Sequence, residues 1–158
     1  NHKLWRIFYM RGICHERSDD WIQAEKDFLK ALIIEPDQPQ VLNYLAYGWI
    51  ERNVFIDRSL EMLKKAVQES PESHHILDSL AWAYFKKNDL AKAVELMEEV
   101  IIKAPGEAIS LDHLGDIYFA LGRKREAYFM WKQAKDLAEP EDEISDSIQL
   151  KLQKYNAG

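Results

Sequence analysis

The sequence predicts an all-α fold, a solenoid of four helix hairpins closed by a C-terminal capping helix. An internal repeat is marked by four prolines spaced by 35, 34 and 35 residues: Pro36, Pro71, Pro105 and Pro140. Four further columns of residues keep this spacing along the chain. The 158 residues include only 6 glycines and 5 prolines, too few for a protein built from many short strands and turns.

Each repeat places small residues before large apolar ones at helical spacing. The first small column holds Gly12, Ala46, Ala81 and Gly115, and the second holds Ala24, Ser59, Ala93 and Ala127. Large apolar residues follow the second column at Phe28, Leu63, Met97 and Trp131, and then come Ala31, Ala66, Val100 and Ala134. Ala24, Phe28 and Ala31 therefore share one helix face. A hairpin of this kind cannot bury both faces alone, so neighbouring hairpins must stack.

The composition excludes several classes of protein. The formal net charge is -6, with 21 Lys and Arg against 27 Asp and Glu, which argues against a nucleic-acid-binding surface. The single cysteine, Cys14, excludes a disulfide within the chain and a multi-cysteine metal site. No apolar run is long enough to span a membrane. The sequence also lacks a phosphate-binding loop, a nucleophile elbow and an H-E-x-x-H zinc motif.

The repeat resembles the tetratricopeptide (TPR) motif, Leu-Gly/Ala-x-x-Tyr followed by Ala-x-x-x-Phe-x-x-Ala and a closing Pro. The third and fourth repeats match it best, through Leu80, Ala81, Tyr84, Ala93, Met97 and Pro105 and through Leu114, Gly115, Tyr118, Ala127, Trp131 and Ala134. The first repeat departs from it, with Arg11 in place of Leu and His15 in place of Tyr. The resemblance covers roughly residues 5 to 140 and implies right-handed stacking. Within the family, the chain is similar to the C-terminal repeat block of proteobacterial TPR adaptor proteins, some of them envelope lipoproteins.

We expect a single TPR domain over residues 1–158. The repeats are expected at about 4–36, 38–71, 74–105 and 108–140, with a capping helix at 141–156. Their helices are expected at 4–17, 20–34, 38–52, 57–70, 74–87, 90–103, 108–121 and 124–137, and the cap at 142–155. Asp37 is the expected N-cap of the third helix. Because the chain begins Asn1-His2-Lys3 without a Met, we expect a fragment of a longer protein.

The two ends of the solenoid should differ in how well their apolar side chains are covered. The capping helix carries an apolar stripe, Ile144, Ile148, Leu152 and Tyr155, which we expect to cover the last hairpin around Phe129 and Ala134. The acidic run from Glu139 to Asp146 suits the N-terminal end of that helix. At the other end, Leu4, Trp5 and Phe8 have no earlier repeat to cover them.

The candidate binding site is a groove on the concave face, which by the resemblance is lined by the first helix of each repeat. The expected peptide-binding residues are Asn43, Tyr44, Tyr47, Asp78, Ser79, Trp82, Phe85, Asp112, His113, Asp116 and Phe119. Tyr47 and Trp82 are expected as exposed anchors, and Asn43 as a clamp on the peptide backbone. For Tyr44, Phe85 and Phe119, exposure and packing against the next repeat stay equal alternatives. The three aspartates should favour a neutral to basic peptide.

Three other features have a structural and a chemical interpretation. His74 and His75 could bind a metal, but adjacent helical residues point about 100° apart and no further ligand is near in sequence, so surface histidines are expected. Asp112, His113 and Asp116 could support acid–base chemistry, but no nucleophile accompanies them. Cys14 is expected to pack inside the first hairpin.

These observations favour a non-catalytic scaffold that binds a partner peptide or helix in its concave groove. Self-association into homo-oligomers is the alternative, and a hydrolytic enzyme using the Asp112 cluster ranks last. We expect no catalytic residue, cofactor or metal, no nucleic acid, and no membrane insertion by this segment. The residues themselves do not indicate the cellular compartment of the protein. The resemblance favours the bacterial cell envelope, in the periplasm, with the cytoplasm as the alternative.

Overall fold

The computed structural model describes residues 3–157, and this part of the chain forms nine helices and no strand. They are α1 (Leu4–Arg17), α2 (Trp21–Ile34), α3 (Pro39–Glu51), α4 (Ile56–Glu69), α5 (His74–Lys86), α6 (Leu90–Lys103), α7 (Ala108–Ala120), α8 (Lys124–Leu137) and α9 (Glu143–Ala157). The expected all-α fold is confirmed. None of the helices in the described part is long and apolar enough to cross a membrane.

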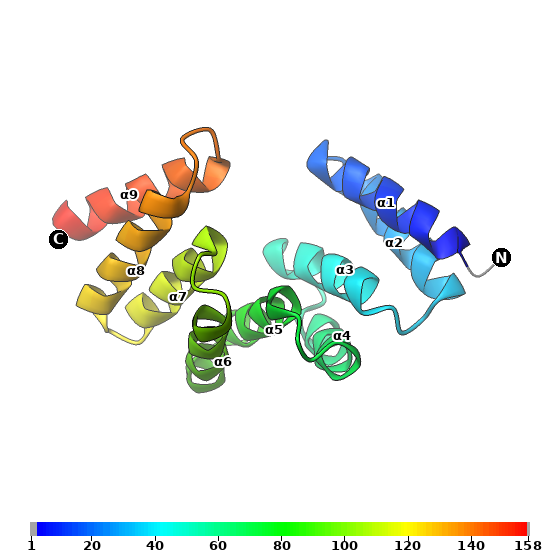
Figure 1. The fold of residues 1–158 in the computed structure, drawn as a ribbon, viewed down its shortest axis with the longest axis horizontal. Helices are drawn as coiled ribbons and strands as arrows, with labels where there is room; N and C mark the ends of the chain where they lie inside the picture. The colour runs from blue at the N-terminus through cyan, green and yellow to red at the C-terminus, as the bar shows by residue number, and fades with distance from the viewer. Residues whose placement is uncertain (1–2, 158) are drawn as a thin grey trace.

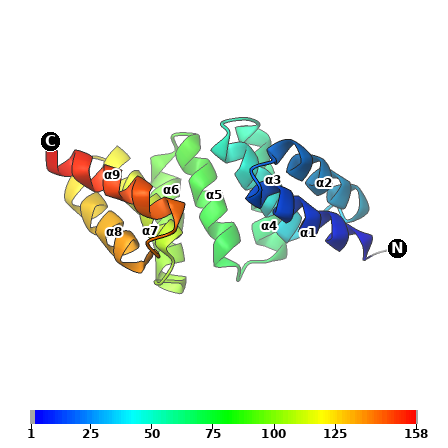
Figure 2. The same cartoon turned by 90° about the horizontal axis from the view of Figure 1, so that it is seen from above.

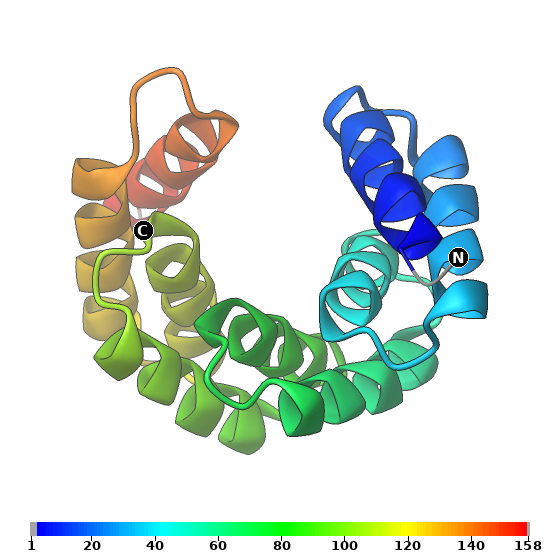
Figure 3. The ribbon, with the colours of Figure 1, turned by 45° about the vertical axis from the view of Figure 1, so that its right-hand side comes forward.

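The helices form an open arc (Figure 1). Seen from above, they follow one another along the long axis from α1 and α2 at one end to α8 and α9 at the other (Figure 2). Figure 3 shows α1, α3, α5 and α7 on the inner side of the arc, with α2, α4, α6 and α8 on the outer side. The first helix of each repeat therefore faces the concave side.

Side chains at the helix starts and left-handed residues in the turns explain the helix boundaries. Asp20, Ser73 and Asp89 accept hydrogen bonds from backbone N–H groups in the first turns of α2, α5 and α6. The chain reverses within each hairpin at a residue with positive φ: Asp19, Asn53, Asn88 or Gly122. The expected N-cap at Asp37 is wrong. Gln38 caps α3 instead, because Pro39, which has no N–H to be capped, takes the first helical position.

The small residues of the first column lie at contacts between helices, as expected. Ala46 and Ala81 are fully buried. A Cβ atom added to Gly115 would lie only 2.3 Å from Nε1 of Trp131, and one added to Gly12 would lie 2.6 Å from Phe28. These positions therefore hold the two helices of a hairpin close together.

The C-terminal helix α9 covers the last hairpin. Ile148 and Leu152 are buried in one apolar cluster with Ala134, and Ile144 and Tyr155 pack against it. The predicted stripe is thus confirmed. Phe129 is the exception, because its side chain remains 60% exposed with α9 in place. The expectation that α9 covers Phe129 is wrong, since this side chain does not belong to the apolar cluster that α9 completes.

The N-terminal end of the described chain is covered less well. Leu4 is exposed, and Trp5 and Phe8 are half-buried against the first hairpin. Cys14 is exposed, so its expected packing inside this hairpin is wrong. In α1 Gly12 is the buried residue, because the helix packs mainly on α2.

Candidate functional site: a groove on the concave face

A groove of about 410 Å³ lies on the inner face of the arc; we call it the central groove. Its lining residues come from α1, α3, α5 and α7 and from the N-cap of α7: Tyr9, Gln40, Asn43, Tyr44, Tyr47, His75, Asp78, Ser79, Glu107, Ile109, Ser110 and His113. Six of the predicted site residues are brought together here, namely Asn43, Tyr44, Tyr47, Asp78, Ser79 and His113. This volume is of the size that accommodates a ligand or several side chains of a peptide.

The N-terminal side of the central groove combines aromatic rings with one unsatisfied amide. The ring of Tyr44 meets Tyr9 edge-on, with 5.6 Å between centroids, and also lies 5.8 Å from Phe28. Tyr44 therefore both lines the groove and packs on its neighbours. Burial raises the pKa of Tyr9 to about 12, so its hydroxyl stays neutral. The side-chain oxygen of Asn43 is buried and has no hydrogen-bond partner among the described residues.

Trp82 is packed under the groove and does not project into it. Its side chain is only 6% exposed, and its ring stacks on Phe85 at 4.6 Å and on His113 at 4.0 Å. The indole Nε1 donates a hydrogen bond of 2.7 Å to Glu51. The expected exposed anchor at Trp82 is wrong, because a side chain of the next repeat covers the ring. Phe85 is likewise half-buried.

Tyr47 is half-buried and joins the same cluster. Its hydroxyl lies 3.4 Å from Nε2 of His113, a residue 66 positions further along the chain. This contact links α3 with α7, two repeats apart. The expectation of a freely exposed Tyr47 is therefore also wrong, although one edge of the side chain still lines the central groove.

Asp78 and His113 form a buried ion pair below the groove. Nδ1 of His113 donates a hydrogen bond of 2.8 Å to Asp78, and the Ser110 hydroxyl donates another to the same carboxylate. Burial alone would raise the pKa of Asp78, but attraction to His113 and the two hydrogen bonds outweigh burial and lower it. Burial alone would lower the pKa of His113, and Asp78 outweighs that effect and raises it. Each partner therefore favours the charged form of the other.

A second ion pair occupies the other two predicted aspartates. Nζ of Lys151, on α9, lies 2.7 Å from Asp112 and 3.0 Å from Asp116. Burial and the neighbouring Asp116 raise the pKa of Asp112 despite Lys151. We expected the three predicted aspartates to favour a neutral to basic peptide, but each has a basic partner within the chain, His113 for Asp78 and Lys151 for the other two. Sequence reasoning did not place Lys151 beside α7, because the two residues of each ion pair are at least 35 positions apart.

Phe119 and Asp116 lie outside the central groove. Both line a separate pocket of about 610 Å³ between α7, α8 and α9, together with Lys124, Trp131, Lys151, Lys154 and Tyr155. The predicted site residues that line a pocket are thus divided between two separate pockets. Phe119 remains partly exposed beside Trp131, with 5.6 Å between ring centroids.

The Asp112, His113 and Asp116 cluster holds helices together. Both ring nitrogens of His113 face partners, Asp78 on one side and the Tyr47 hydroxyl on the other. Both carboxylates face Lys151. Each of these three side chains therefore already has an intramolecular partner.

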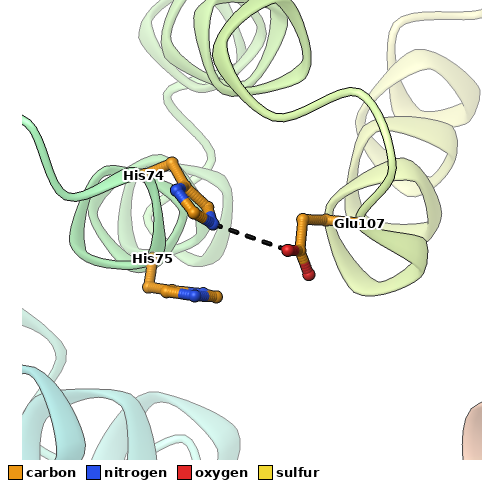
Figure 4. A group of neighbouring side chains, drawn as sticks. All are labelled: His74, His75 and Glu107. Carbon is orange, nitrogen blue, oxygen red and sulfur yellow. Dashed lines mark ion pairs between the residues drawn. The ribbon is translucent and has the colours of Figure 1, made fainter.

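The fold brings a third group beside the two adjacent histidines. The rings of His74 and His75 lie 4.0 Å apart at the start of α5, and Nε2 of His74 is 3.6 Å from a carboxylate oxygen of Glu107 (Figure 4). The three residues each offer a ligand atom within 4.8 Å of the others. Glu107 is distant in sequence and comes from the next repeat, so the sequence did not indicate it; the expected surface position is confirmed for His75, which is exposed, while His74 is half-buried.

Comparisons with known proteins agree with this architecture. A family model described as a tetratricopeptide repeat matches residues 56–111. A TPR repeat-containing protein of Pseudomonas aeruginosa is 29% identical over 110 residues, which are 70% of this chain but only 18% of that relative. The chain therefore spans less than a fifth of the length of this relative.

Two solved structures show the same fold at low sequence identity. A thermophilic TPR protein of Thermus thermophilus has a TM-score of 0.83 at 21% identity, over 97% of this chain and 81% of that one. MamA from Desulfovibrio magneticus, from residue 41 to its end, has a TM-score of 0.70 at 20% identity, over 87% and 77% of the two chains. The chain therefore contains a match to the tetratricopeptide repeat over residues 56–111, and its described part has the same fold as these TPR structures.

Proposed function

We propose that the protein is a non-catalytic interaction scaffold whose central groove binds an extended peptide or a helix of a partner protein. A solenoid presents a long concave surface that is suited to this role. The observation that carries the proposal is the grouping of an unsatisfied amide, Asn43, with exposed apolar surface in one groove. Ile109 lines this groove and is 54% exposed, although it is a large aliphatic side chain.

The contacts inside the chain define the chemistry of the ligand. An apolar ligand side chain would bury Ile109 and the free edge of Tyr44. A peptide N–H group would satisfy the Asn43 oxygen after rotation of the terminal amide. Because Asp78 is paired with His113, the carboxylate in the groove that is left to attract a cation is Glu107. The proposed ligand is therefore a largely neutral peptide with an apolar anchor, and any preference for a basic residue depends on Glu107.

A peptide-display selection against the immobilised chain would supply a ligand for the test. Binding of a selected peptide would then be measured for Asn43→Ala, Ile109→Ala and the control Phe129→Ala. Phe129 is a matched control because it is a large exposed residue on α8, a helix that contributes no residue to the central groove. We expect at least a roughly tenfold rise in Kd for each groove variant and less than a twofold change for the control. Equal affinity of the groove variants and the native chain would contradict the proposal.

Self-association is a second candidate, favoured by exposed apolar residues on α1. Ile7 is 60% exposed and Met10 is 65% exposed on this helix. Light scattering over a dilution series would detect an oligomer, and Ile7→Ser with Met10→Ser should dissociate it. A monomeric mass at every concentration would contradict this candidate and leave the groove proposal intact.

A further inference from the structure

We propose that His74, His75 and Glu107 form a binding site for a divalent transition metal ion, with zinc as the best-suited ion. Imidazole nitrogen and carboxylate oxygen are common zinc ligands, and three protein ligands with one open position are a frequent arrangement. The site joins the third repeat to the fourth, because the histidines begin α5 and Glu107 caps α7. Two of the three residues, His75 and Glu107, also line the central groove, but binding of the ion does not require a peptide.

The distances between the ligand atoms require only a small contraction. In a tetrahedral zinc site with bonds of about 2.1 Å, neighbouring ligand atoms lie roughly 3.4 Å apart. Nε2 of His74 and the Glu107 oxygen are already 3.6 Å apart, and no pair in the set exceeds 4.8 Å. Figure 4 shows the Glu107 carboxylate opposite both rings. Rotation of exposed side chains is sufficient to close the remaining distance, because His75 and Glu107 are both accessible.

The hydrogen-bonding state of His74 also indicates a missing partner. Its Nε2 is buried and has no hydrogen-bond partner among the described residues, while Glu107 lies just beyond hydrogen-bond distance. A buried ring nitrogen in this state normally finds a partner. A metal ion between the ring and the carboxylate would satisfy both groups. Adjacent histidines can share the ion because their rings lie 4.0 Å apart and do not diverge.

Two features limit the affinity and define the coordination. Both helix starts carry the positive end of a helix dipole, which disfavours a cation and makes a weak to moderate site the expected one. His75 and Glu107 also line the central groove, and with three protein ligands a fourth coordination position would stay open. Water would fill this position in the free protein.

Calorimetric titration of the chain with ZnCl₂, after removal of any histidine tag, tests the site without a peptide. We expect one ion per chain, and a rise in melting temperature with added zinc because the ion binds only the folded protein. His75→Ala and Glu107→Gln should each weaken binding at least about tenfold. His15→Gln is the matched control and should bind zinc like the native chain, because His15 is in the first repeat.

A second readout separates direct ligation from an indirect effect. The ring nitrogen resonances of His74 and His75 should shift on addition of zinc, and those of His15 should not. The proposal is overturned if zinc fails to bind, or if His75→Ala and Glu107→Gln bind it as tightly as the native chain. It is also overturned if zinc shifts all three histidines alike. None of these results depends on whether the groove binds a peptide.

Discussion

At the scale of single residues, the size of one small side chain sets the distance between the two helices of each hairpin. Where the small residue is glycine, it faces an aromatic ring, and where it is alanine, it shares a core cluster with an aliphatic side chain. The pairs are Gly12 with Phe28, Ala46 with Leu63, Ala81 with Met97, and Gly115 with Trp131. Each hairpin therefore reaches a close packing with its own combination of sizes.

Gly115→Ala should destabilise the fold although alanine is the better helix former. The added Cβ would lie 2.3 Å from Nε1 of Trp131, and that nitrogen is held by a hydrogen bond of 3.1 Å to Asp116. Overpacking costs about 1–3 kcal/mol, against a gain in helix propensity of about 1 kcal/mol. Urea unfolding should show a net loss. Gly106→Ala is the control, because its Cβ would meet no atom within 4 Å and its stability should stay equal or rise.

The buried pair of His113 and Asp78 should make stability depend on pH. The folded pKa of His113 is raised above its ordinary 6.5, so its contribution is complete below 6.5 and is lost as pH rises through the folded pKa. The folded pKa of Asp78 is lowered below 3.8, so its contribution is present above 3.8 and is lost as pH falls through the folded pKa. Between pH 3.8 and pH 6.5 both contributions are present, so the pair stabilises the fold in this range.

We therefore expect the melting temperature of the native chain to fall as pH rises above about 6.5 and through the folded pKa of His113. His113→Gln should melt lower throughout, because Asp78 loses its charged partner, but should show a flatter dependence on pH. The aspartates and Lys151 that surround His113 are the same in both proteins, so the difference in slope isolates this histidine. If the melting temperatures of the native chain and of His113→Gln had the same dependence on pH, the pKa of His113 would be the same in the folded and unfolded states.

At the scale of elements, α9 supplies both an apolar cover and a buried cation. Its apolar side fills the last core cluster through Ile148 and Leu152, and its Lys151 neutralises Asp112 and Asp116 on α7. Removing a helix of this kind exposes apolar surface and leaves two neighbouring carboxylates without their cation. Deletion of residues 141–158 should therefore cost several kcal/mol, since each fully buried large side chain contributes roughly 1.5–3 kcal/mol.

Substitution of Lys151 tests the contribution of its charge separately from the apolar packing of α9. Lys151→Met keeps most of the side-chain volume but leaves Asp112 buried beside Asp116, so we expect a loss of about 1–3 kcal/mol in unfolding experiments. The exposed Lys154→Met is the control and should change stability by less than about 0.5 kcal/mol. Adding Asp112→Asn to Lys151→Met should recover part of the loss. Equal effects of the two lysine substitutions would contradict the role of the ion pair.

The elements were predictable from the sequence because their signals are local. Apolar periodicity and turn residues placed every helix start and end within two residues of the structure. The contacts between elements were not predictable in this way. The repeat register places Trp82 on the inner face of its helix, but only the curvature of the array decides whether His113 covers it. The pairing of Lys151 with Asp112, 39 positions apart, and the approach of Glu107 to His74 depend on the same curvature.

At the scale of the whole molecule, the core is divided into successive clusters and is not one centre. One cluster contains Phe28 and Leu45 of the first hairpins, a second contains Leu63 and Leu80, and the C-terminal one ends at Leu152. Helices contact mainly their neighbours in the array. Stability in such an array is approximately a sum of terms for each repeat and each interface between repeats.

A destabilising substitution at one end of the array should therefore affect mainly the helices near that end. Leu152→Ala removes a buried side chain from the C-terminal cluster, at a cost of about 2–5 kcal/mol. In hydrogen-exchange mass spectrometry, we expect faster exchange in α7, α8 and α9 and unchanged exchange in α1 and α2. Leu63→Ala, the matched change in the middle of the array, should instead raise exchange on both sides, because its cluster joins α3, α4 and α5. If Leu152→Ala accelerated exchange equally in α1 and α9, the chain would unfold as one unit, and links across repeats such as Tyr47 to His113 would outweigh the contacts between neighbours.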